Sequence, residues 1–361
     1  MSYITAIGTA NPGLPLSQRE LADLVCARIQ LKPAEQRLLK SIYKSSGIDY
    51  RHSILSPADA DYFSSTAERM KKYKLHALQL CLQAIENCVS SMAEFNSQGI
   101  THLITVSCTG MYAPGLDVEI IQHLNLNSSI HRTAVNFMGC YGAFNALKIA
   151  HAICQADRQA QVLVVSVELC TLHFQDRADL DNITANAIFA DGAAAVIIQA
   201  SPAAGLSICL QDFYCDLLPQ TQEQMAWRIG DLGFDIVLSS YVPDSIEYGI
   251  NTFVSGLLDK HQLAVSNIDY YAIHPGGLKI LKACEKALNI SAEDNVFSYR
   301  ILRNYGNMSS ATVLFILKEI WGSLNQDDHD KKILSCAFGP GLTLESMLLK
   351  IHYRDRYCEE R

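Results

Sequence analysis

The sequence predicts an α/β layered fold that is built from two similar halves. Strand-like and helix-like segments alternate along the 361 residues, which is the pattern of a layered α/β protein. The segments 188–200 and 335–351 resemble each other, because each is a Gly-containing turn followed by a buried strand. A chain of this length also exceeds one comfortable hydrophobic core. We therefore expect a duplicated unit, with one half at 1–205 and the other at 206–361.

The expected elements follow from hydrophobic periodicity, taken in chain order. The first half is expected to contain helices at 76–95 and after residue 140, and strands at 3–10, 101–109, 134–137, 161–169 and 193–200. The second half is expected to contain a strand at 267–274, a two-strand unit at 331–353, and helices at 242–261, 276–288 and 309–324. The charged end, 353–361, is expected to fray.

Composition excludes several classes of protein. The formal net charge of −8 disfavours nucleic acid or an anionic membrane as the main partner. No signal peptide and no apolar run of membrane-spanning length is visible. The twelve cysteines form neither a C-x-x-C motif nor a zinc spacing, so no metal site is expected. They lie in apolar segments, which is typical of buried, reduced thiols in a cytoplasmic protein.

One cysteine stands apart from the others. Cys140 lies where a short strand meets a helix, in the stretch Met-Gly-Cys-Tyr-Gly. The positive end of the helix dipole is expected to lower the pKa of its thiol, and the turn is expected to expose the sulfur. The flanking Gly139 and Gly142 would let a substrate approach closely. Cys108 also ends a strand, but a Pro-Gly turn follows it, so we expect it to pack or to line a cavity.

A nucleophilic cysteine needs a base, and His274 is the best placed histidine. It ends the strand Tyr-Tyr-Ala-Ile, and the Pro-Gly-Gly turn that follows leaves room for an imidazole to face a cleft. Asn307 follows Gly306 and precedes a Ser-rich helix start. If Ser309 or Ser310 caps that helix, the Asn307 amide is free to donate a hydrogen bond to an oxygen. Taken singly, such residues are more often a packed core histidine and a plain turn asparagine.

A Cys/His/Asn set fits two reaction classes. One is amide hydrolysis, as in papain-like proteases, and the order and spacing of Cys140, His274 and Asn307 agree with it. Those enzymes keep their cysteine near the mature N-terminus in a different sequence context, so this class is disfavoured. The other class is thioester chemistry, in which an acyl group moves to the cysteine and a carbon–carbon bond is then formed.

Five motifs favour thioester chemistry. GCYGAFNAL, IFADGAAAVI, AIHPGG, YGNMSSATVLF and FGPGLTLE occur in the order and at the separations of the type III polyketide synthases, the chalcone-synthase-like enzymes. The ketoacyl synthase that begins fatty-acid synthesis has a similar Cys/His/Asn set, but its histidine is not followed by Pro-Gly-Gly. Its asparagine segment also usually reads Gly-Asn-Thr-Ser. Over nearly its whole length, the chain therefore resembles a type III polyketide synthase of the bacterial type.

The resemblance implies a thiolase-like fold in an αβαβα layered arrangement, a homodimer and a CoA-dependent acyltransferase. By resemblance, Cys140 carries the acyl group, and His274 and Asn307 complete the triad. His274 as imidazolium would stabilise the Cys140 thiolate. His274 and Asn307 would both donate to the enolate oxygen that forms when malonyl-CoA loses CO2. Repeated condensation and ring closure would follow, without a metal or redox cofactor.

The resemblance also implies a set of substrate-binding positions, which are Phe189, Phe234, Cys108, Cys170, His173, Met225, Ser309 and Gly277. Phe189 and Phe234 match residues that separate the CoA tunnel from the cavity, and Lys44 and Arg51 are the nearest matches to the basic residues of that tunnel. Their alternative interpretation is that the two phenylalanines are core aromatics and the two cations a solvated surface.

Several positions depart from the plant members of the family. Plant enzymes carry threonine at Cys108 and His173, glycine at Met225, and at Ala113 a methionine that enters the partner's cavity. These departures argue against a chalcone or stilbene product and favour a fatty-acyl starter that gives an alkylpyrone or alkylresorcinol. The chief alternative is a ketoacyl synthase III-like enzyme that performs one condensation with an acyl carrier protein partner. A non-enzymatic scaffold is disfavoured, because all three triad positions are filled.

Overall fold

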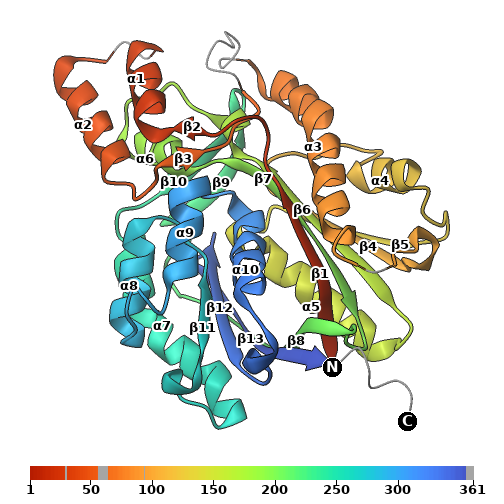
Figure 1. Ribbon diagram of the computed structural model, residues 1–361. Coiled ribbons are helices and arrows are strands. Elements are labelled where there is room, and N and C mark those ends of the chain that lie inside the picture. The colour runs from red at the N-terminus through yellow and green to blue at the C-terminus, as the bar shows by residue number, and fades with distance from the viewer. Residues whose placement is uncertain (29–30, 56–63, 93, 355–361) are drawn as a thin grey trace, which may run out of the picture.

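The computed structural model describes residues 1–28, 31–55, 64–92 and 94–354. Within this part of the chain, nine strands form one mixed sheet (Figure 1). Their order is β11 (Tyr270–Ile273), β12 (Lys332–Gly339), β13 (Thr343–Arg354), β8 (Gly205–Leu217), β1 (Ser2–Ala10), β7 (Asp191–Gln199), β6 (Gln161–Leu169), β4 (His102–Ser107) and β5 (His131–Asn136). Two short pairs lie apart from it, namely β2 (Leu16–Ser17) with β3 (Tyr50–Arg51), and β9 (Met225–Gly230) with β10 (Gly233–Leu238).

Helices cover both sides of the sheet, and Figure 1 shows α3 and α4 on one side of the molecule and α7 and α8 on the other. The helices are α1 (Gln18–Arg28), α2 (Pro33–Lys44), α3 (Thr66–Val89), α4 (Leu116–Leu124), α5 (Gly142–Ala156), α6 (Leu180–Ile188), α7 (Val242–Leu258), α8 (Leu278–Leu288), α9 (Val296–Tyr305) and α10 (Thr312–Ser323). Short 3-10 turns at Gly139–Tyr141 and Ser309–Ala311 lead into α5 and α10.

Three hydrophobic clusters separate the layers. The central cluster joins α5 and α10 to strands of both halves, with Phe144 and Phe315 among its members. A second packs α3 against the first-half strands, and a third packs α7 and α8 against the second-half strands. Val164 of β6 lies in the central cluster and Val165 in the outer one, because side chains alternate between the faces of a strand. The first-half and second-half parts of the sheet thus lie on either side of α5 and α10, so the layers run helix, strands, helix, strands, helix, as the αβαβα prediction requires.

The two halves repeat one topology. In the first half, β4 and β6 run parallel, α5 leads into β6, and β7 returns antiparallel. In the second half, β11 and β12 run parallel, α10 leads into β12, and β13 returns antiparallel. The similar segments 188–200 and 335–351 contain β7 and β13, so they occupy corresponding places. The boundary between residues 205 and 206, at the start of β8, stays a prediction.

Some elements differ from the sequence-based expectation in their limits. The helix expected at 76–95 begins at Thr66, where the Ser65 side chain accepts from the Glu68 N–H, and it ends at Val89. The strand expected at 267–274 is shorter, and helix α10 begins only after a 3-10 turn. The sequence patterns did not predict helices α1 and α2 or the hairpin β9–β10. The end that was expected to fray lies mostly beyond residue 354, outside the described residues.

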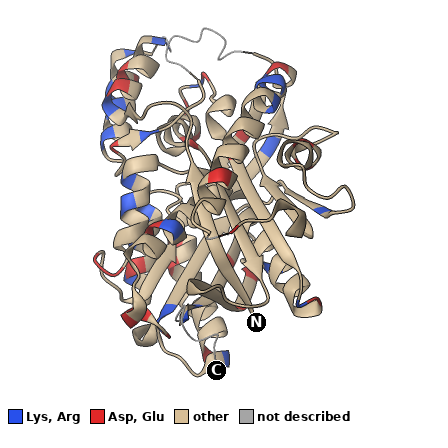
Figure 2. Ribbon diagram, turned by 45° about the vertical axis from the view of Figure 1, so that its right-hand side comes forward, with Lys and Arg blue, Asp and Glu red and all other residues tan. Residues whose placement is uncertain are grey.

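Charged residues lie mainly at the periphery. Figure 2 shows most of the Lys, Arg, Asp and Glu ribbon on helices and loops, whereas the strands are almost uncoloured. Among the described residues, no helix is long and apolar enough to cross a membrane.

Candidate active site

One cavity of about 440 Å³ lies where the carboxyl ends of strands from both halves meet, next to α1, α2 and α6. Ligand sites of α/β folds commonly occur at such strand ends. Every triad and substrate-binding residue expected from the sequence lines this cavity, namely Cys140, His274, Asn307, Cys108, Cys170, His173, Phe189, Met225, Phe234, Gly277 and Ser309.

Cys140 is held in the turn between β5 and α5. Gly139 has a φ of +74°, and a Cβ there would lie 2.4 Å from Cδ of Pro340. A Cβ on Gly142 would lie 2.9 Å from Cγ1 of Val106. Both glycines are thus needed for close packing between protein segments. Gly139 also lines the cavity, and the expectation that the two glycines let a substrate approach closely stays a prediction.

The thiol of Cys140 is not activated by its position before a helix. The residue is half-buried and lines the cavity. Burial raises the pKa of Cys140 to about 12, although hydrogen bonding to the side chains of Ser309 and Asn307 acts in the opposite direction. The predicted lowering of the thiol pKa is therefore wrong for the ligand-free protein. Desolvation outweighs the helix dipole, whose effect on a nearby charge is modest.

His274 is buried at the end of β11 with its ring facing the cavity. Its backbone N–H donates to the Cys336 carbonyl at 2.8 Å, which ties it to β12. The side chain is 1% exposed, and among the described residues neither ring nitrogen has a hydrogen-bond partner. Burial lowers the pKa of His274 to about 3. An unpaired buried imidazole is costly to keep, which points to a group that bonds a ligand.

The backbone of Asn307 is clamped to the end of α6. Its N–H donates to the Ile188 carbonyl and its carbonyl accepts from the Ala190 N–H, both at 2.9 Å. In the side chain, Oδ1 accepts from the Ser309 N–H at 2.8 Å, and Nδ2 donates to the Gly276 carbonyl at 3.3 Å. Because Oδ1 is occupied, the NH2 end of the amide is the end available to an oxygen of a substrate.

The predicted serine caps of α10 are wrong. No side chain of Ser309 or Ser310 caps this helix; the Thr312 hydroxyl accepts from the Met308 N–H instead. The Ser310 hydroxyl donates to the buried carboxylate of Glu168. The Asn307 NH2 group is still available as a donor, as predicted, but the reason differs. The backbone N–H of Ser309 occupies Oδ1 of the amide, so the NH2 end is the end that faces a ligand.

Cys140, His274 and Asn307 together can serve acyl transfer. Burial holds the thiol and the imidazole neutral when each is considered alone, so the charged pair expected from the sequence is not the form that burial favours. Proton transfer from Cys140 to His274 would leave the cavity without net charge, and it therefore costs less than ionising either group alone. His274 and Asn307 line the same cavity as the sulfur, and both side chains carry N–H groups of the kind that can stabilise a developing oxyanion.

His173 fixes the aromatic wall of the cavity. Its Nδ1 accepts from the Phe234 N–H at 2.9 Å, so its Nε2–H donates to the Thr109 carbonyl at 2.7 Å. The ring stacks on Phe234 with centroids 4.1 Å apart, and Trp227 meets it edge-on. Burial lowers the pKa of His173 to about 3, which keeps it neutral. His173 therefore holds Phe234 in place as well as lining the cavity.

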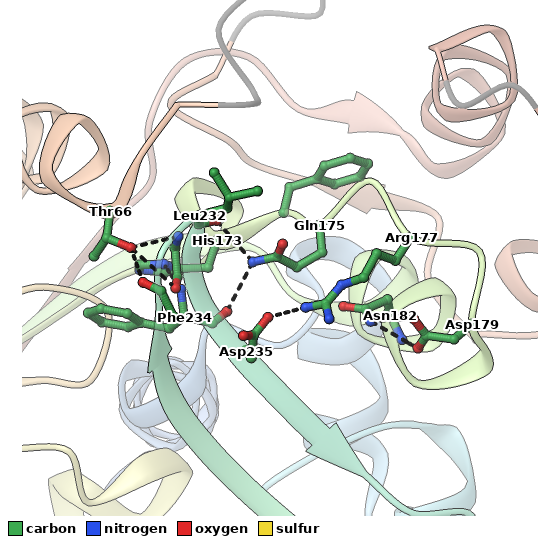
Figure 3. Close-up of polar contacts among 12 residues, drawn as sticks. Thr66, His173, Gln175, Arg177, Asp179, Asn182, Leu232, Phe234 and Asp235 are labelled. Atoms are coloured by element: carbon green, nitrogen blue, oxygen red, sulfur yellow. Dashed lines mark hydrogen bonds and ion pairs between the residues drawn. The ribbon is translucent and has the colours of Figure 1, made fainter.

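The hairpin β9–β10 is attached to the first half mainly through side chains, and one backbone bond joins the Thr66 N–H to the Asp231 carbonyl in its turn at 2.8 Å. Figure 3 shows Gln175 reaching the Leu232 and Phe234 carbonyls, Arg177 paired with Asp235, and Thr66 at the hairpin turn. The Trp227 Nε1–H donates to the Cys108 carbonyl at 2.7 Å. These contacts place Met225 and Phe234 on the cavity wall.

The structure also places the two residues matched to the CoA tunnel and the one matched to the partner's cavity. Lys44 is exposed at the end of α2 and is not part of the cavity lining. Arg51 lines the cavity but is only 5% exposed, and its Nε and one terminal nitrogen donate to protein groups. Ala113 is exposed on the loop before α4, away from the cavity of its own subunit.

Sequence reasoning missed Glu168, which lies under the site. Its carboxylate accepts from the Cys108 N–H, the Thr109 hydroxyl and the Ser310 hydroxyl. Burial raises its pKa, and the hydrogen bonds oppose that rise. The signal was present in the sequence, because Glu168 is the single charged residue of the buried strand QVLVVSVEL.

Comparison with known proteins identifies the family. Residues 1–202 match the family model of the N-terminal domain of chalcone and stilbene synthases, and residues 209–352 match that of the C-terminal domain. An alpha-pyrone synthesis polyketide synthase-like protein of Mycobacterium tuberculosis is 32% identical over 364 residues, which is 97% of this chain and 91% of that protein. A 1,3,6,8-tetrahydroxynaphthalene synthase of Streptomyces peucetius subsp. caesius is 30% identical over 96% of this chain and 92% of its own.

Solved structures give the same answer. The C-terminal type III polyketide synthase domain of a type I/III hybrid from Dictyostelium superposes with a TM-score of 0.91 at 29% identity, over 97% of this chain and 99% of that chain. A polyketide synthase from the brown alga Ectocarpus siliculosus gives 0.89 at 28% identity, over 97% and 98%. The thiolase-like fold is confirmed, and a ketoacyl synthase is not favoured. The chain belongs to the chalcone and stilbene synthase family, the type III polyketide synthases, which are decarboxylating acyltransferases.

Proposed function

We propose that the protein loads a fatty-acyl group from acyl-CoA onto Cys140, extends it with malonyl-CoA and closes the product as an alkylpyrone or alkylresorcinol. One observation carries the proposal: the cavity that holds Cys140, His274 and Asn307 is also lined by many apolar side chains, including Leu21, Val25, Ile42, Ile236 and Val242. Its volume of about 440 Å³ lies in the usual range for small-molecule sites, about 300–1,000 Å³. A pyrone is favoured because a relative is named for alpha-pyrone synthesis.

In the proposed acylation, His274 takes the proton of Cys140. The sulfur then attacks the thioester carbonyl of acyl-CoA, a new carbon–sulfur bond forms, and CoA leaves with the proton as its free thiol. Asn307 and the imidazole lie beside the sulfur and stabilise the tetrahedral oxyanion.

In the proposed extension, malonyl-CoA loses CO2 by cleavage of its carbon–carbon bond, and the electron pair moves to the thioester oxygen as an enolate. His274 and Asn307 donate hydrogen bonds to that oxygen. The enolate carbon attacks the Cys140 thioester, so a carbon–carbon bond forms and the carbon–sulfur bond breaks. Return of the lengthened chain to Cys140 permits another cycle, and attack of an enol oxygen on the thioester closes a pyrone. The prediction that no metal or redox cofactor is needed stays a prediction.

The mouth of the cavity is marked by lining residues that are exposed, which are Leu24, Ser45, Leu180, Ser240 and Lys279. Lys279 is the cation of this set and lies in the first turn of α8. We place the phosphates of CoA at this mouth, because Lys44 does not line the cavity and Arg51 is buried in its wall, whereas Lys279 is exposed. The apolar members suit the alkyl part of a long acyl thioester.

The homodimer also stays a proposal, and the edge strand β5 supports it. β5 ends the nine-stranded sheet, and His131, Arg132, Ala134 and Asn136 are exposed along it. An exposed edge invites pairing with another strand. A second copy of the chain that pairs there would cover this edge and the nearby loop with Met111 and Ala113.

The proposed function is tested by incubating the protein with labelled malonyl-CoA and a series of acyl-CoA starters. Extracted alkylpyrones or alkylresorcinols are expected from long-chain starters. A single 3-ketoacyl product made with an acyl carrier protein would instead support the ketoacyl synthase alternative. Absence of any condensation product with all starters would contradict the proposal.

A further inference from the structure

Arg51 is a buried cation that donates hydrogen bonds to the protein on two sides. Its Nε–H donates to Gln18 Oε1 at 2.9 Å, and one terminal nitrogen donates to the Phe189 carbonyl at 2.5 Å. The guanidinium lies over the Tyr43 ring, 5.6 Å from its centroid. A cation that were to bind CoA phosphates would need donors that point to solvent or to the cavity mouth. Arg51 instead points at the end of helix α6.

The contacts of Arg51 belong to a set that closes the C-terminal end of α6. The last carbonyl groups of a helix lack partners within the helix. Here the Asn186 carbonyl accepts from the Tyr43 hydroxyl, the Ala187 carbonyl from the Gln18 amide, and the Phe189 carbonyl from Arg51. A positive charge is also favourable at the negative end of the helix dipole. Segments from 18 to 51 therefore fix the position of residues 186–189.

The carbonyl of Ile188, also at this end of α6, contacts the backbone of Asn307, whose side-chain amide is the proposed oxyanion donor. The Ile188 carbonyl accepts from the Asn307 N–H, and the Ala190 N–H donates back to the Asn307 carbonyl. Residue Gly306, just before it, has a φ of +71°, and a Cβ there would lie 2.9 Å from Cγ and Cδ of Arg51. Arg51 thus touches both sides of the bridge between residues 189 and 307.

We propose that Arg51 is a positioning residue that sets the Asn307 amide and the Phe189 ring by clamping the end of α6, and that it is not a ligand of CoA. Its fork donates in two directions at once, to Gln18 and to Phe189, while its stem packs on Gly306. A lysine carries the same charge but only one nitrogen, so it cannot keep both contacts. The proposal deepens the proposed function, because it assigns the group that holds one of its oxyanion donors.

The two roles predict different kinetics for Arg51→Lys. A positioning role predicts that kcat for malonyl-CoA decarboxylation falls about 10- to 100-fold, since small displacements of a catalytic group have such effects, while KM changes little. A CoA ligand predicts a raised KM with a nearly unchanged kcat. Arg51→Lys should also add almost nothing to the loss seen in Asn307→Ala, because the two changes remove the same donor.

Alkylation of Cys140 gives a readout that does not need turnover. Hydrogen bonding to Asn307 favours the Cys140 thiolate. Displacing Asn307 should therefore slow inactivation by iodoacetamide in Arg51→Lys as much as in Asn307→Ala, and the double variant should be no slower. An unchanged alkylation rate in Arg51→Lys would overturn the proposal.

A matched control separates positioning from loss of stability. Arg69 is another buried arginine, and it donates to the backbone carbonyls of Leu172 and Phe174. Arg69→Lys should lower the melting temperature by a similar amount while it leaves decarboxylation and alkylation near the wild-type values. If the wild type makes no polyketide, the proposed function fails, while the alkylation series still decides the role of Arg51. If polyketides form and Arg51→Lys keeps its kcat, the positioning role alone fails.

Discussion

The cavity has two walls that are attached to the fold in different ways. The floor, which consists of the proposed catalytic residues Cys140, His274 and Asn307, is held by backbone contacts such as those of His274 with Cys336 and of Asn307 with Ile188. The hairpin wall, which consists of β9 and β10, forms its own two-stranded sheet and is attached to the first half mainly through side chains, with one backbone bond from Thr66 to Asp231. Backbone bonds survive most substitutions, whereas side-chain bonds do not. Sequence change can therefore reshape the wall while the floor keeps its geometry.

The largest effect is expected at the nucleophile of the floor. Cys140→Ala should abolish product formation, a loss of more than about 10³-fold, because no acyl group can be carried. Decarboxylation of malonyl-CoA should persist, since His274 and Asn307 remain. Release of labelled CO2 and mass spectrometry of the extracts measure the two activities separately. Products formed at the wild-type rate would remove Cys140 from the mechanism.

The second expected effect concerns the oxyanion donors. Asn307→Ala should lower kcat for decarboxylation by about 10²- to 10³-fold, which is the usual cost of one such donor. Asn304 lies three residues earlier and is exposed, so Asn304→Ala is the matched control and should behave as wild type. Equal activity of the two variants would show that Asn307 does not act on the reacting oxygen.

The protonation state of the floor can be measured directly. Because burial raises the pKa of Cys140 to about 12, the rate of its alkylation by iodoacetamide should rise about tenfold per pH unit from pH 7 to pH 9. Active-site labelling followed by peptide mass spectrometry measures this rate. A rate that is already constant above pH 6 would show instead that a thiolate–imidazolium pair exists before substrate binds.

In the hairpin wall, the largest effect is expected at His173. His173→Phe keeps a ring against Phe234 but leaves the Phe234 N–H and the Thr109 carbonyl without partners, at about 1–3 kcal/mol for each buried group. Chemical denaturation at pH 7.5 should show this loss. The range of accepted starters should broaden, while malonyl-CoA decarboxylation changes far less than in Asn307→Ala. A loss of decarboxylation as large as that of Asn307→Ala would instead show that the hairpin wall determines the geometry of the floor.

The same variant should change the response of stability to acid. The pKa of His173 is lowered on folding, so the native state binds fewer protons than the unfolded state below pH 6.5. The contribution of His173 to the free energy of unfolding is fully present above about pH 6.5. It is lost as the pH falls toward 3, by about 1.4 kcal/mol per pH unit. His173→Phe should remove that contribution and flatten the curve between pH 6 and pH 4. An equally steep curve would contradict the assignment.

The smallest effect is expected at the rim of the hairpin wall. Arg177 and Asp235 form an ion pair with about half of the arginine and 39% of the aspartate side chain exposed. Exposed pairs contribute about 0–1 kcal/mol, and salt screens them. Arg177→Ala should thus change the free energy of unfolding by less than about 1 kcal/mol, with unaltered kinetics. A larger loss of unfolding free energy would show that the hairpin wall depends on the Arg177–Asp235 ion pair.

The sequence predicted the floor better than the wall, and the reason is local. The layered α/β class follows from periodicity, and the places of Cys140 and His274 at strand ends follow from the turns beside them. Their meeting with Asn307 was inferred from the resemblance of whole motifs. The fold confirms that these residues share one cavity, although their roles stay proposals.

The effects that escaped prediction depend on long-range contacts. Cys140 was expected to have a lowered pKa, but tertiary burial decides the sign of the shift. Arg51 was matched to a basic residue of the CoA tunnel, with a solvated surface as the alternative, and its contacts with Gln18 and Phe189 exist only once distant segments pack. The hairpin β9–β10 has weak periodicity, and nothing in the sequence signalled that its Trp227 and Phe234 would meet His173.

The strand β1 has a consequence for how the protein is made. It precedes the other eight strands of the sheet in chain order, yet it lies in the middle of the sheet, where Tyr3 pairs with Gln199 of β7 and Ser2 with Leu210 of β8. Contacts between residues so far apart in the chain slow folding. During synthesis at about 5–20 residues per second, β1 waits at least about ten seconds before its neighbours emerge. Throughout that interval a nascent chain carries an apolar strand with both edges open, so this family member should depend on protection at the ribosome more than a protein whose first strand lies at an edge.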